Sequence, residues 1–225
     1  MNRSEDTTAI PAADDPSGRL LDAAERLFAE RGFNGVSVRT ITAEAGVNLA
    51  SAHYYYRTKL SLFRAVFERR VLPMNAERLA RLEKAWPDRS LAPDLREVLE
   101  AFIGPTIIVS SEAGETFRRL SGLSSTDPAP EVRETVFGLY DEVAPLFVAA
   151  LRKIRPDLGE RDLLWRLKCI FGAMMFVRAD NGRPEQLVGL PHAPVDAEEA
   201  MRHLIPYLAS IFELPPVAPT KRRRK

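Results

Sequence analysis

The sequence predicts an all-α protein, with a three-helix helix-turn-helix unit followed by a larger helical bundle. Three observations lead to this prediction. Apolar residues recur at helical spacing in successive segments, alternating strand patterns are almost absent, and clusters of Gly, Pro and Asn/Asp/Ser separate the segments. With 225 residues, of which 45% are hydrophobic, the chain is long enough to bury a sizeable core.

The N-terminal helices are defined by their caps. The first helix is predicted over residues 17–31, where an apolar stripe ends at a glycine. Ser37 is the expected N-cap of the second helix, which ends at Gly46, and Asn48 caps a short third helix that ends near Tyr54. The tight turn at Gly46 between these two short helices has the spacing of a helix-turn-helix.

The remaining helices form the predicted bundle. A long fourth helix is expected to begin after Thr58, to kink at Pro73 and to end before Trp86. Asp196, with a glutamate three residues later, has the pattern of a capping box for the last helix. The helices expected beyond residue 87 cover 92–110, 114–124, 130–154, 160–179 and 196–212, and a Gly- and Pro-containing loop is expected over 180–195.

The charges are unevenly distributed, although 32 Lys+Arg nearly balance 31 Asp+Glu. Residues 16–70 hold nine basic and five acidic side chains, whereas residues 71–220 hold 17 basic and 22 acidic ones. A basic N-terminal block on an acidic body indicates that the first segment faces a polyanion. The N-terminal arm, 1–16, and the tail that ends in KRRRK, 215–225, are expected to be disordered.

Several other classes of protein are not supported by the sequence. The single Cys169 excludes a disulfide framework and is expected in the core. The three histidines have no metal-ligand spacing, no glycine-rich phosphate loop is present, and no catalytic constellation is apparent, so we expect neither an enzyme nor a metal site nor a cofactor. No apolar segment is long enough to cross a membrane and the N-terminus has no signal core, which favours a soluble cytoplasmic protein. The alternative to a DNA-binding protein is a helical small-molecule-binding or scaffold protein.

The stretch from Arg19 to Phe67 closely resembles the DNA-binding domain of TetR-family transcriptional regulators. The resemblance lies in the Ala-Ala and Leu-Phe pairs of the first helix, the Gly-Phe turn, the Ala-Gly-Val turn, a tyrosine of the third helix and the lysine of the fourth. It implies a homodimeric repressor that binds a palindromic operator, with a DNA-binding domain over 17–64 and an effector-binding and dimerisation domain over 65–214.

The resemblance also implies which side chains contact DNA. Family members often have Tyr, His and Phe where this chain has His53, Tyr55 and Tyr56; here the Tyr55 hydroxyl would replace the histidine at a phosphate, and Tyr56 is assigned to packing. Hydroxyl and cationic side chains can reach phosphate oxygens, and Arg39 can pair with guanine. The implied DNA-contacting set is Ser37, Arg39, Thr40, Asn48, Leu49, Ala50, Ser51, His53, Tyr54, Tyr55, Thr58 and Lys59.

For the C-terminal domain, the resemblance implies an effector pocket and a dimer interface. The helices over 160–179 and 196–212 are expected to pair with those of a second subunit. The run from Val47 to Ser51, together with Pro73, Asn75 and Arg78 downstream, is also similar to a subgroup that includes fatty-acid-responsive repressors. The effector class stays open between a fatty acid or acyl thioester and an aromatic or drug-like compound. Candidate pocket residues are Phe102, Thr106, Phe117, Ser121, Tyr140, Phe147, Trp165, Met174 and Arg178.

Overall fold

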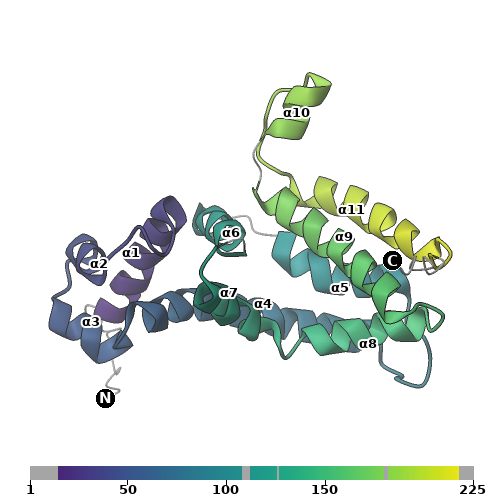
Figure 1. Cartoon of the computed structure of the whole chain (residues 1–225), viewed down its shortest axis with the longest axis horizontal. Coiled ribbons are helices and arrows are strands. Elements are labelled where there is room, and N and C mark those ends of the chain that lie inside the picture. Colours follow the sequence, from purple (N-terminus) through teal and green to yellow (C-terminus); the bar gives the residue numbers. More distant parts are fainter. Residues whose placement is uncertain (1–14, 108–111, 126, 180–181, 218–225) are drawn as a thin grey trace, which may run out of the picture. The chain divides into compact units, whose positions relative to one another are not determined.

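The computed structural model describes residues 15–107, 112–125, 127–179 and 182–217, and most of these residues are helical (Figure 1). They form eleven α-helices and one short 3-10 turn, with no strand among them, which confirms the predicted all-α class. The chain divides into two compact units, and the boundary falls between Val66 and Phe67 within helix α4. The expected arm, apart from its last two residues, and all of the tail beyond residue 217 lie outside the described residues.

The first unit consists of α1 (Pro16–Arg31), α2 (Val38–Ala45), α3 (Leu49–Tyr56) and the start of α4 (Lys59–Ala85). Its centre is a set of three aromatic rings, Phe28, Phe33 and Phe63, whose centroids lie 5.1 to 5.9 Å apart. Phe28 and Phe63 are fully buried. These rings fasten the α1–α2 loop between α1 and α4, and offset or edge-to-face pairs of this kind add to the stabilisation from burial.

The helix-turn-helix has the local structure that its sequence predicts. The Ser37 hydroxyl accepts the Thr40 N–H at 3.0 Å, and the Asn48 side chain accepts the Ser51 N–H at 2.7 Å. Gly46 ends α2 in the left-handed conformation, with φ +62°. A residue with a Cβ would be strained in this conformation, so the short turn depends on glycine.

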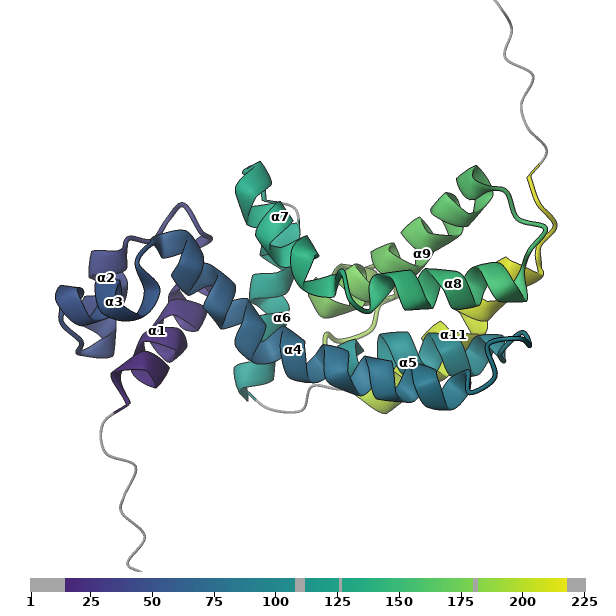
Figure 2. The same ribbon diagram turned by 90° about the horizontal axis from the view of Figure 1, so that it is seen from below.

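The second unit contains the rest of α4 and the remaining helices. Its elements are α5 (Leu95–Ile107), α6 (Glu112–Ser125), α7 (Pro130–Phe137), η1 (Gly138–Tyr140), α8 (Ala144–Ile154), α9 (Glu160–Ala179), α10 (Arg183–Val188) and α11 (Ala197–Glu213). Helix α5 packs against α8, α9 and α11, while α6 packs against α7 and α9 (Figure 2). α4 continues through Pro73 without a break.

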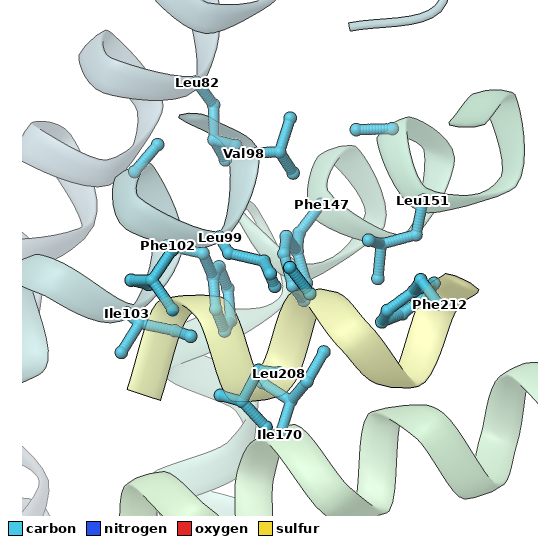
Figure 3. Packing of buried hydrophobic residues seen from close by; sticks show 14 of the residues in the cluster. Leu82, Val98, Leu99, Phe102, Ile103, Phe147, Leu151, Ile170, Leu208 and Phe212 are labelled. Atoms are coloured by element: carbon cyan, nitrogen blue, oxygen red, sulfur yellow. The ribbon is translucent and has the colours of Figure 1, made fainter. Parts of the chain in front are cut away.

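The core of the second unit forms where α5, α8, α9 and α11 meet (Figure 3). The Phe102 ring lies nearly parallel to the Phe147 ring, with centroids 3.9 Å apart. Leu208 of α11 and Ile170 of α9 are buried in the same cluster. Leu208 is therefore a core residue of the single chain, and its burial here needs no second subunit.

Three expectations are wrong in this unit. The single helix predicted over 130–154 is interrupted, because α7 gives way to η1 at Gly138 and α8 begins anew at Ala144. The predicted loop over 180–195 contains the short helix α10, bounded by the left-handed glycines Gly182 and Gly189. Cys169, which was expected in the core, is exposed because it lies on the outward side of α9. In addition, residues 108–110 of the helix predicted over 92–110 lie outside the described residues.

We expect Gly46→Ala and Gly122→Ala to change stability in opposite directions. A Cβ at either position meets no atom within 4 Å, so the two substitutions differ only in backbone conformation. Gly46→Ala should lower the free energy of unfolding by about 1–2 kcal/mol because φ is positive there. Gly122→Ala, inside helix α6, should raise it by about 0.5–1 kcal/mol. Urea unfolding measures both, and equal effects would refute the role of the left-handed turn.

Candidate nucleic-acid interface and ligand cavity

Helix α3 leaves most of its side chains exposed. Of its eight residues only Ala52 is buried, and the Tyr54 side chain is 83% exposed. The helix is held by its N-cap, its turn, the buried Ala52 and the partly buried Ser51 and Tyr56, and its other five side chains are open to a partner. This is the geometry that a DNA-recognition helix requires, because its side chains must reach base edges in the major groove.

The residues expected to contact DNA are accessible on α2, α3 and the start of α4. Nine of the twelve are exposed: Ser37, Arg39, Asn48, Leu49, Ala50, His53, Tyr54, Tyr55 and Thr58. The other three, Thr40, Ser51 and Lys59, are partly buried. Tyr56 is also partly buried, and its hydroxyl lies 2.7 Å from the Ser17 hydroxyl. The structure thus ties Tyr56 to α1, whereas its neighbours on α3 are open to solvent.

The charge around these residues is positive. Between residues 37 and 64 the cations are Arg39, Arg57, Lys59 and Arg64, and the single acid is Glu44. The Glu44 carboxylate pairs with Arg26 of α1 at 3.4 Å. The N-termini of α2 and α4, capped by Ser37 and Thr58, add positive dipole ends.

The structure gives Lys59 a role inside the first unit that the sequence does not indicate. Its ammonium donates to the Phe33 carbonyl at 3.0 Å and to the Val36 carbonyl at 3.1 Å. It also lies 4.2 Å from the centroid of the Phe33 ring. Two of the three N–H donors thus fasten the α1–α2 loop to α4, which leaves one donor for a phosphate.

The second unit contains a cavity of about 430 Å³ with a mostly apolar wall. Its lining residues are Arg78, Phe102, Ser121, Val136, Phe137, Tyr140, Asp141, Ala144, Phe171, Met174 and Met175. The volume lies within the range of small-molecule sites. Four of the nine predicted pocket residues, Phe102, Ser121, Tyr140 and Met174, are among them.

The other predicted pocket residues lie elsewhere. Phe117 packs edge-on against Phe67, Phe147 stacks in the core behind Phe102, and Thr106 is buried as a hydrogen-bond partner of Arg78. Trp165 is 58% exposed on α9 and lines no part of the cavity, because it lies on the outward side of that helix. The side chain of Arg178 lies outside the described residues.

Arg78, which the sequence marks only through the subgroup resemblance, is a charged residue buried in the cavity wall, 2% exposed. Its Nε donates to the Phe102 carbonyl at 2.9 Å, Nη1 donates to the Asn75 amide oxygen at 3.0 Å, and Nη2 donates to the Thr106 hydroxyl. Asn75 in turn donates to the Leu139 carbonyl at 2.7 Å. Helical spacing alone places Arg78 among the polar residues of α4, and only the fold shows it buried.

No group of three or more potential metal ligands occurs within the described ranges. Nor does any helix of those ranges have the length and apolar character needed to span a membrane. The chain thus has a capped helix-turn-helix whose second helix is exposed and surrounded by positive charge. These features place it in the class of helix-turn-helix DNA-binding proteins.

Comparisons with protein families identify the particular family. A model described as bacterial regulatory proteins, tetR family, matches residues 20–66. A second model, tetracyclin repressor-like, C-terminal domain, matches residues 100–210. The chain belongs to the TetR family of DNA-binding transcription regulators, a family that is not enzymatic. No curated protein matched the chain in the corresponding search.

Solved structures share the fold at low sequence identity. The fatty acid degradation regulator FadR from Bacillus halodurans has a TM-score of 0.64 at 16% identity, covering 88% of this chain and 96% of its own. FadR from Bacillus subtilis in complex with stearoyl-CoA has a TM-score of 0.59 at 14% identity, with coverages of 86% and 97%. The multidrug binding protein EbrR complexed with imidazole has a TM-score of 0.54 at 20% identity, with coverages of 90% and 97%.

Replacing Lys59 by Met should destabilise the first unit. The substitution keeps the length of the side chain but removes the donors to the Phe33 and Val36 carbonyls, so we expect a loss of about 1–3 kcal/mol. Arg39→Ala is the matched control, since Arg39 is exposed and its loss should change stability by less than about 0.5 kcal/mol. Chemical denaturation measures both, and equal stabilities of the two variants would contradict this role for Lys59.

Proposed function

We propose that the protein is a homodimeric repressor that binds a palindromic operator and is released by a small molecule bound in its C-terminal unit. The observation that carries the proposal is the exposure of α3, a helix in which only Ala52 is buried. The two recognition helices of a dimer would enter successive major grooves about one DNA turn, roughly 34–36 Å, apart or a multiple of it.

The proposed contacts divide into positioning and base readout. Hydroxyls of Ser37, Tyr54 and Tyr55 and the remaining donor of Lys59 would bind phosphates, which fixes the register on the duplex. Base readout would be sparse. Leu49 and Ala50 offer only apolar contact to a thymine methyl group, while Arg39 can donate two hydrogen bonds to guanine.

Arg39→Ala should weaken operator binding by about 1–3 kcal/mol and relax specificity at one base pair. Arg96→Ala is the matched control, since Arg96 is an exposed arginine of α5 outside the helix-turn-helix. Fluorescence anisotropy with operator and with single-base variants of it measures both effects. Unchanged discrimination among those operators in the Arg39 variant would reject its role in base readout.

Exposed apolar side chains on α9 and α11 support the proposed dimer interface. Leu164, Trp165 and Phe176 of α9 and Tyr207 of α11 are all exposed in the single chain. The two helices pack on each other, and the apolar side chains on their outward sides mark a protein–protein interaction surface. In a symmetric dimer the same helices would cover each other across a two-fold axis.

Trp165→Glu and Phe176→Glu should each convert the dimer into a monomer at micromolar concentration, because a carboxylate would be buried without a partner in the interface. Leu91→Glu is the matched control: Leu91 is also an exposed apolar residue but lies between α4 and α5. Light scattering after size-exclusion chromatography measures the mass. Dimers of unchanged mass in both α9 variants would place the interface elsewhere.

The cavity lined by Phe102, Tyr140 and Met174 is the proposed effector site. α4 supplies both Arg78 in the cavity wall and Lys59 beside the helix-turn-helix, so a ligand that favours one tilt of α4 would change the fit to DNA. Coupling of about 1–3 kcal/mol would lower operator affinity roughly 5–150-fold.

A thermal-shift screen for ligands, followed by operator binding with each hit, tests whether a bound ligand releases the operator. Stabilising ligands that leave operator affinity within twofold would reject release by the effector.

A further inference from the structure

Helix α10 lies outside the packed helices of the second unit (Figure 1), and none of its six residues is buried. Leu187 and Val188 at the end of this helix and Leu190 just beyond it are between 62% and 70% exposed. Apolar side chains that lie close together in water favour association with another apolar surface. These three side chains therefore mark a contact that the single chain does not make.

Residues 182–192, called the α10 segment below, begin and end at one place. Gly182 has φ +67°, and a Cβ added to it would lie 3.0 Å from the His192 ring. Gly189 has φ +75°, and its N–H donates to the Gln186 carbonyl at the end of the helix. The backbone thus specifies both ends of α10, and the segment leaves the body of the unit and returns to it at the same point.

The length of α10 requires packing that its own chain does not supply. An isolated helix needs about 12–15 residues to be even marginally stable in water, so a helix of six residues depends on burial of its side chains. No residue of α10 is buried within the single chain. The packing that stabilises this helix therefore comes from a second molecule.

The charge of the α10 segment identifies the chemistry of that second molecule. The segment carries one arginine, Arg183, and one glutamate, Glu185, so its formal net charge is zero with His192 neutral. Binding to DNA and adsorption to an anionic membrane both depend on an excess of cationic side chains. A neutral segment with exposed leucine and valine side chains instead fits an apolar protein surface.

The position of α10 in the chain points to a second copy of this protein. The helix follows α9, which has Phe176 exposed near its end, and precedes α11, which has Tyr207 exposed. An element that connects both helices of the proposed dimer interface lies at the edge of that interface. The nearest foreign surface there is the second subunit.

We propose that α10 packs against the second subunit, with Leu187, Val188 and Leu190 in an apolar contact that adds to the one between α9 and α11. This inference rests on the proposed homodimer and assigns a further part of its interface. In a two-fold symmetric dimer each subunit offers the same segment to the other, so the contact occurs twice. One substitution in the segment therefore changes two contacts of the dimer.

Leu187→Glu and Leu190→Glu should each raise the dimer dissociation constant at least tenfold, because each places two carboxylates in apolar contacts. Since α10 has no buried residue, both variants should keep the helix content of the wild type, measured by circular dichroism. Leu91→Glu is the matched control: Leu91 is 64% exposed, lies outside the segment, and its substitution should leave the constant within twofold. Sedimentation equilibrium measures the constant. A change of less than threefold in both variants of the segment overturns the proposal.

Photo-crosslinking of the purified protein identifies the surface that the segment contacts. Benzoylphenylalanine in place of Leu187 should give a covalent dimer on irradiation, and the same group in place of Leu91 should not. Crosslinks confined to a single chain overturn the proposal, because the segment would then pack on its own subunit. Sedimentation with phosphatidylglycerol vesicles that is lost in Leu187→Glu also overturns it, because the segment would then bind a membrane.

Trp165→Glu and Phe176→Glu separate this inference from the proposed function. If these α9 variants dissociate the dimer while the variants of the α10 segment do not, the interface of α9 and α11 stands and the contact of α10 fails. If only the variants of the α10 segment dissociate the dimer, the contact of α10 stands and the interface of α9 and α11 fails. A wild-type protein that is monomeric at micromolar concentration overturns both.

Discussion

Hydrogen bonds from cations of α4 to main-chain carbonyl groups are the interactions on which both units depend. The Lys59 ammonium donates hydrogen bonds to the carbonyls of Phe33 and Val36, and the Arg78 guanidinium donates one to the carbonyl of Phe102. A carbonyl in a loop or a helical turn has lost its water on burial and needs a donor in exchange. Because the donors sit on one long helix, the same element that carries the DNA-binding end also builds the wall of the cavity.

The junction between α7 and α8 lines one side of that cavity. Phe137, Tyr140, Asp141 and Ala144 all line it, and they come from the end of α7, the η1 turn and the start of α8. Their spacing of i, i+3, i+4 and i+7 is that of a single helix face, and the side chains stay together across the η1 turn. Asn75 fastens the turn by donating to the Leu139 carbonyl, so the buried polar network and the shape of the cavity depend on each other.

Exposure on α3 and on α9 has different physical meanings. On α3 the exposed residues are polar or small apart from Leu49 and the tyrosines, in a positively charged setting suited to a polyanion. On α9 the exposed residues include Trp165 and Phe176, whose contact with water costs free energy and favours association with another apolar surface. Both helices thus leave surfaces open, one suited to nucleic acid and the other to protein.

The sequence alone determined the features that local chemistry encodes. The caps at Ser37 and Asn48 and the left-handed turn at Gly46 place α2 and α3, because each depends on residues close in sequence. Only the tertiary structure decided that Arg78 is buried, that Trp165 and Cys169 are exposed, and that Phe147 lies behind Phe102 instead of in the cavity. Periodicity does not say which of several apolar faces meets a neighbour. The periodicity also did not reveal the break at Gly138. The backbone of Gly138 stays in the ordinary right-handed region, so the end of α7 depends on long-range packing and not on a local turn signal.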